Sequence, residues 1–147
     1  MKCVRQGMFE TNSSSSHSMV IVCGEYPLGR LPETPEGTIE LFGGEFGWEV
    51  EIYSDAFTKA SYCLTYAKTG GGEQCEEMLR TVLESTTGLP VVFRERDDEY
   101  YPWGYIDHQS HVGEGNICAV AFQSQQALRD FIFNEQSTLL TDNDNHE

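Results

Sequence analysis

A chain of 147 residues with 39% hydrophobic and 12% aromatic residues has the size and apolar content of one folded domain, which excludes an intrinsically disordered chain. Its 24 acidic residues against 9 basic ones give a formal net charge of -15, which opposes direct binding to nucleic acid and to anionic membrane surfaces. No apolar run approaches the roughly 18 residues that cross a bilayer, and no apolar segment typical of a signal peptide follows Met1, so we expect a protein of the cytoplasm.

The five cysteines bear on redox state and on metal binding. Their number is odd, they are scattered along the chain, and none of them form a C-x-x-C pair. We therefore expect free, buried thiols without a disulfide framework, no structural metal and no cofactor.

The first part of the chain alternates turn-forming and strand-forming segments. Residues 8–18 are rich in serine, whose short side chain competes for backbone hydrogen bonds and favours a loop. The apolar, β-branched run 19–23 predicts a buried strand, and three prolines within 24–37 predict an irregular surface connection. Residues 38–42 predict a short strand, and alternating apolar and acidic residues over 48–53 predict a strand with one solvated face.

Two helices are predicted in the middle of the chain. The first extends from an N-cap at Ser54 to about Lys68, with apolar residues at helical spacing. The second ends at Gly88 and is the clearest element, because its apolar residues recur at i, i+3, i+4, i+7 and i+8. This stripe consists of Cys75, Met78, Leu79, Val82 and Leu83. We expect it to pack against a sheet that contains the runs 19–23 and 117–122.

The C-terminal part completes a single domain over residues 1–147. The elements predicted there are a strand over 90–93, a charged loop over 94–115, a buried strand over 117–122, a helix over 124–134 capped by Ser124, and a polar, frayed tail over 142–147. Together the elements predict an α+β (mixed α/β) fold of about five strands packed with about three helices, without internal repeats.

The first candidate site is the polar segment before the strand at 19–23. Its groups suit an oxyanion such as phosphate, and Ser16 beside His17 has the chemistry of a nucleophile and its base. The residues assigned to ligand binding in this segment are Asn12, Ser13 and Ser14. A serine-rich loop whose hydroxyls bond its own backbone explains the same composition and is the commoner arrangement.

The second candidate site lies within residues 105–111, where Asp107 and His108 are the catalytic candidates. The residues assigned to binding beside them are Gln109 and Ser110. An exposed surface loop with histidines explains this segment equally well.

The two candidate segments each lack a group that the other holds. Neighbouring residues on a strand point to opposite faces, so Asp107 cannot orient His108 there. We therefore predict that the segments meet, with Asp107 orienting His17 or His108 serving Ser16. A functional site would leave an imidazole nitrogen and a hydroxyl facing a cleft, whereas a structural latch would bury and saturate them.

Acidic residues cluster in two places. Seven acids lie between Glu25 and Glu51, against Arg30 alone. A second cluster stands beside aromatic residues and consists of Asp97, Asp98 and Glu99, with Trp103 close behind. Acids that steer and aromatics that anchor are what an interface with a basic protein needs, although most charge runs are simply solvated surface.

The blocks 5–18 and 105–110, together with the segments 131–134 and 142–145, resemble a family of small, functionally uncharacterised proteins of bacteriophages and related mobile elements. The resemblance implies a phage-encoded origin and action in the cytoplasm of the host bacterium. It also makes counter-defence or host takeover plausible roles, and it assigns no catalytic residue.

Three hypotheses of function follow. The first is a phage accessory protein that binds and inhibits or redirects a basic host partner, such as nucleic-acid-handling or defence machinery. The second is an enzyme or phosphate-binding protein with a Ser/His/Asp site built from the two polar segments. The third is a minor component of the virion.

Overall fold

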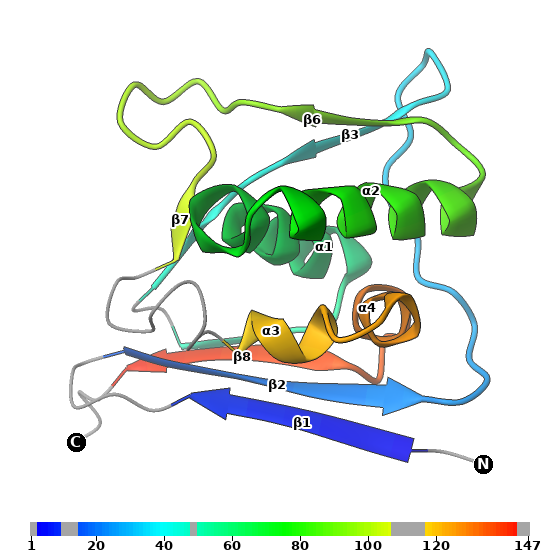
Figure 1. The fold of residues 1–147 in the computed structure, drawn as a ribbon, viewed down its shortest axis with the longest axis vertical. Helices are drawn as coiled ribbons and strands as arrows, with labels where there is room; N and C mark the ends of the chain where they lie inside the picture. The colour runs from blue at the N-terminus through cyan, green and yellow to red at the C-terminus, as the bar shows by residue number, and fades with distance from the viewer. Residues whose placement is uncertain (1–2, 10–14, 48–49, 107–116, 144–147) are drawn as a thin grey trace.

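The computed structural model describes residues 3–9, 15–47, 50–106 and 117–143. These residues form a mixed α+β domain, as the sequence predicts, with more strands than the five expected. Figure 1 shows the helices between a four-stranded sheet on one side and a two-stranded pair on the other.

The larger sheet is antiparallel and joins segments from both ends of the chain. Its strands are β1 (Cys3–Phe9), β2 (Ser15–Cys23), β8 (Thr138–Asn143) and β5 (Glu51–Tyr53). They lie in the order β1-β2-β8-β5, so the C-terminal strand occupies an interior position of the sheet.

Two predictions for the chain ends are therefore wrong. Residues 8–18 are not one loop, because β1 continues to Phe9 and β2 already begins at Ser15. The frayed tail predicted over 142–147 starts too early, because Asp142 and Asn143 belong to β8 and pair with the start of β2, whereas residues 144–147 lie outside the described residues. Polar residues are tolerated in β2 and β8 because the ladder supplies the hydrogen bonds of their backbone N–H and C=O groups.

Two short parallel pairs complete the sheet structure. The strands β3 (Ile39–Phe42) and β6 (Val91–Arg94) form one pair, which confirms the strands predicted at 38–42 and 90–93. The strands β4 (Glu45–Phe46) and β7 (Tyr105–Ile106) form the other. The predicted loop over 94–115 thus contains the strand β7.

The two predicted central helices are present. The helix α1 (Ala56–Tyr66) is capped by Asp55 rather than Ser54, because the Asp55 carboxylate accepts a hydrogen bond from the Thr58 N–H at 2.8 Å. A π-helical turn, η1 (Ala67–Gly71), connects it to α2 (Glu73–Thr87). Gly88 ends α2 with a φ of 73°, a left-handed conformation that glycine adopts without steric cost.

The prediction for residues 117–122 is wrong. This run forms a short helix, α3 (Cys118–Ala121), and not a strand. A short, continuous apolar run has no periodicity that separates a buried helix from a buried strand. The helix that follows, α4 (Gln125–Phe133), begins as predicted, with the Ser124 hydroxyl accepting from the Ala127 N–H at 3.0 Å.

The core lies between the two sheets, where α2 buries Leu79, Val82 and Leu83. The predicted apolar stripe therefore faces inward. It packs against α4, α1 and β6, while α4 covers β2 (Figure 1). The expectation that α2 would pack directly on the run 19–23 is thus corrected, because α4 occupies that face of the sheet.

The cysteines are not all free thiols. Cys63, Cys75 and Cys118 are free, as predicted, but Cys23 is disulfide-bonded. A disulfide depends on Cα atoms about 4.4–6.8 Å apart in space, which spacing along the chain does not show. Within the described ranges, no helix combines the length and the apolar character needed to span a membrane.

Candidate functional site

The His17 side chain lies in the core, at 1% relative exposure, on the strand β2. Its Nδ1 is 2.9 Å from the Tyr62 hydroxyl and its Nε2 is 3.0 Å from the Gly47 carbonyl oxygen. A carbonyl oxygen only accepts, so Nε2 carries the proton, and in the neutral ring Nδ1 accepts from the Tyr62 O–H. Both ring nitrogens are therefore engaged.

This environment is that of a structural latch. A general base needs a ring nitrogen within reach of the proton that it removes, and the two nitrogens of His17 already bond Tyr62 and Gly47. Ser16, the neighbour of His17 in β2, pairs through its backbone with Asp142 of β8.

Most residues of the predicted Ser/His/Asp site lie outside the described residues. These are Asn12, Ser13, Ser14, Asp107, His108, Gln109 and Ser110. The predicted meeting of the two polar segments therefore stays a prediction. Among the residues that the structure does describe, no group of three or more His, Cys, Asp or Glu side chains could hold a metal ion.

The acidic triplet lies in the β6–β7 loop, which we define as residues 95–104. Asp98 organises this loop, because its Oδ1 accepts from the N–H groups of Tyr100 and Tyr101 at 2.9 and 3.0 Å. These two hydrogen bonds, from Tyr101 and then Tyr100, lower the pKa of Asp98. The Arg96 guanidinium lies 3.5 Å from Asp98 and also pairs with Glu45 of β4.

The tip of the β6–β7 loop is open to solvent. Tyr100 is 81% exposed, and Tyr101 is 50% exposed, with its ring centre 4.9 Å from that of Tyr105. Glu95, Asp97 and Glu99 are exposed beside them and form no ion pair with any described residue. The loop therefore presents unpaired carboxylates and two phenol rings on a backbone held by Asp98.

Trp103 belongs to the base of this loop and not to its open tip. The Lys68 ammonium lies 4.1 Å from the centre of the Trp103 ring and forms an ion pair with Glu76 at 2.6 Å. The chain is also closely packed here, because a Cβ on Gly104, whose φ is 78°, would lie 2.1 Å from the Gly44 carbonyl oxygen. Trp103 thus anchors the loop to the helices.

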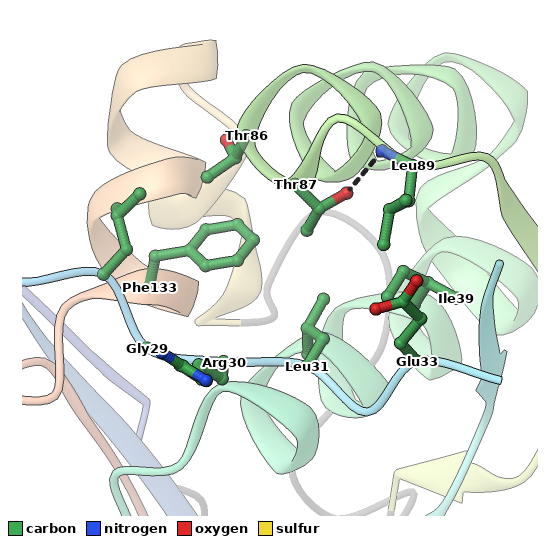
Figure 2. Close-up of a pocket in the computed structure, with 10 residues that line it drawn as sticks. Gly29, Arg30, Leu31, Glu33, Ile39, Thr86, Thr87, Leu89 and Phe133 are labelled. Atoms are coloured by element: carbon green, nitrogen blue, oxygen red, sulfur yellow. Dashed lines mark hydrogen bonds between the residues drawn. The ribbon is translucent and has the colours of Figure 1, made fainter. Parts of the chain in front are cut away.

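A concave site, the α2 pocket, lies at the opposite end of α2 from Trp103. Its volume is about 250 Å³, and Figure 2 shows the residues around it. The apolar lining consists of Leu28, Leu31, Ile39, Leu89 and Phe133. Arg30 and Glu33 lie at its mouth, on the connection between β2 and β3, and Gly29 ties that connection to α4 through a 2.7 Å bond to the Phe133 carbonyl oxygen.

Two buried charged residues were not predicted from the sequence. The Lys59 ammonium, on α1, donates to the carbonyl oxygens of Asn134 and Ser137 at 2.8 and 2.9 Å, and burial lowers its pKa to about 8. The Asp130 carboxylate, on α4, accepts from Tyr26 and Gln126, both at 2.7 Å. Both residues stand at helical spacing from the apolar residues of their helices, and this spacing is the signal in the sequence that predicts their burial.

Comparisons of the chain with protein-family models, with curated proteins and with solved structures found no match.

Proposed function

We propose that this chain is an acidic binding protein that recognises a basic partner protein through the β6–β7 loop. The observation that carries the proposal is the exposed pair Tyr100 and Tyr101 next to the unpaired carboxylates of Asp97 and Glu99. Tyrosine supplies large contact area with few rotatable bonds, and neighbouring carboxylates attract lysine and arginine before contact is made.

The loop is also prepared for binding. The hydrogen bonds that the Tyr100 and Tyr101 N–H groups donate to Asp98 fix the turn before a partner arrives. Ordering a loop on association costs free energy, so a loop that is already ordered binds more tightly for the same contacts. Lys68 against Trp103 holds the base of the loop in place.

The partner class in this proposal is a nucleic-acid-handling protein of a bacterial host, including a defence nuclease, with the chain encoded by a phage. Such proteins carry basic grooves for phosphates. A chain with a formal net charge of -15 is attracted to these grooves and repelled by the nucleic acid itself. Occupying the groove would inhibit or redirect the partner. The resemblance to phage-encoded proteins supports the phage origin.

The test compares two charge reversals of equal size. One variant carries Asp97→Lys and Glu99→Lys, and the control carries Glu25→Lys and Glu36→Lys, two exposed acids outside the loop. Each immobilised protein is exposed to bacterial lysate, the retained proteins are identified, and association rates are measured from low salt to about 0.15 M salt.

We expect the wild type and the control to retain the same basic protein, with association slowing as salt rises. The loop variant should associate about tenfold more slowly at low salt. Equal losses in both variants would show that net charge and not the loop directs binding. Retention that does not depend on salt would contradict electrostatic recognition.

A further inference from the structure

We propose that the α2 pocket binds a small organic cation, a primary ammonium carried on an apolar body about the size of one aromatic ring. This site is separate from the β6–β7 loop, which lies at the other end of the molecule (Figure 1).

The size and lining of the pocket fix the apolar part of the ligand. Its volume of about 250 Å³ exceeds the roughly 150 Å³ in which an apolar cavity holds benzene, and is too small for a nucleotide-sized cofactor. Leu31, Ile39, Leu89 and Phe133 supply aliphatic and aromatic walls. A single ring or branched aliphatic group fills such a space.

The charges around the pocket fix the polar part of the ligand. Figure 2 shows the Glu33 carboxylate turned toward the cavity beside Leu31 and Ile39. Thr87 is the last residue of α2 and Phe133 the last of α4, so two helix C-termini, each with partial negative charge, meet at the pocket. Neither helix has a basic residue in its last turn. The Lys59 ammonium offsets part of the charge at the end of α4, because it bonds the Asn134 and Ser137 carbonyl oxygens, so the end of α2 and Glu33 supply most of the attraction for a cation.

Arg30 is the opposing charge at the mouth. It is exposed, and Figure 2 shows Leu31 between Arg30 and Glu33. Its guanidinium weakens the attraction for a cation without filling the cavity. The two mouth residues therefore predict opposite effects: removing the charge of Glu33 weakens ammonium binding, and removing the charge of Arg30 strengthens it.

The experiment is an NMR titration of the methyl groups of Leu31, Ile39 and Leu89 at constant ionic strength. The probes share one ring and differ in charge: phenethylammonium, the neutral 2-phenylethanol and the anionic phenylacetate. We expect phenethylammonium to shift these methyl signals at the lowest concentration, about two- to fivefold below the alcohol, with phenylacetate weakest.

Matched variants separate a built site from general attraction to an acidic protein. Glu33→Gln should weaken phenethylammonium binding about two- to fivefold, and Arg30→Gln should strengthen it about twofold. The control Glu36→Gln removes an exposed acid from the same connection, outside the pocket lining, and should change nothing.

Several outcomes would overturn the proposal. These are shifts spread evenly over the surface, phenylacetate binding as tightly as phenethylammonium, or equal losses in Glu33→Gln and Glu36→Gln. A blocked Lys-Phe-Lys tripeptide that shifts the pocket methyls while phenethylammonium does not would assign the pocket to a peptide instead.

Discussion

His17 and the β6–β7 loop carry similar chemistry in opposite surroundings. Each combines a titratable group with a tyrosine, and each was a candidate site from the sequence. In the core, the imidazole of His17 bonds Tyr62 and Gly47 with both of its nitrogens. At the surface, Asp98 accepts from Tyr100 and Tyr101 and lies near Arg96 of the same loop, Tyr100 is exposed, and Tyr101 is half-exposed against Tyr105.

The difference separates polar groups that hold the fold from polar groups open to a partner. A buried polar group without a hydrogen bond costs about 1–3 kcal/mol, so the core saturates His17 and leaves it no capacity for a ligand. An exposed carboxylate is solvated by water and can exchange that water for a partner. Both places combine a titratable side chain with a tyrosine, and burial decides whether these groups hold the fold together or can bind a partner.

The largest expected effect tests the buried side of this comparison. His17→Ala removes both hydrogen bonds, leaves the Gly47 carbonyl oxygen and the Tyr62 hydroxyl without these partners, and opens a cavity. We expect the free energy of unfolding to fall by about 2–5 kcal/mol in urea denaturation. Tyr62→Phe, which removes one hydroxyl, should cost about 1 kcal/mol. A His17→Ala protein of wild-type stability would end the latch interpretation.

A second prediction concerns Lys59, which is buried like His17 but carries a charge. Its pKa is about 8 in the folded protein against an ordinary value of 10.5. Between these two pH values the unfolded chain binds the proton and the folded chain does not. The cost of burying the charged Lys59 is therefore relieved, and the free energy of unfolding rises with pH through this window. The gain should reach up to roughly 3 kcal/mol.

Urea denaturation of the wild type and of Lys59→Met between pH 7 and pH 10.5 measures this contribution. Burial raises the pKa of the Tyr66, Cys75 and Cys118 side chains, which lowers stability at high pH in both proteins and cancels in the difference. A difference between the two proteins that stays constant with pH would contradict a lowered pKa.

The smallest expected effect tests the exposed side of the comparison. Asp98→Ala removes the two hydrogen bonds that the loop N–H groups donate to this carboxylate and should lower the free energy of unfolding slightly, as the loss of an exposed helix cap does. It should also speed amide hydrogen exchange at Tyr100 and Tyr101. The matched variant Asp97→Ala changes an exposed carboxylate without such bonds and should stay within about 0.5 kcal/mol of the wild type. Equal behaviour of the two variants would show that Asp98 does not order the loop.

The sequence by itself determined the elements whose signal is local. The apolar stripe of α2, its end at Gly88 and the cap of α4 at Ser124 depend on residues within a few turns of one another, and all three are present. The strands at 19–23, 38–42 and 90–93 follow from short β-branched runs in the same way. The acidic and aromatic character of the β6–β7 loop was also readable from the chain.

Only the tertiary structure decided which groups are enclosed. Strand pairing joins distant segments, so the place of β8 beside β2 and the burial of His17 against Tyr62 leave no mark in local periodicity. The run 117–122 became helix rather than strand for the same reason, since its apolar residues suit either form and packing chose between them. Capping and periodicity act over a few residues, whereas burial depends on the whole fold.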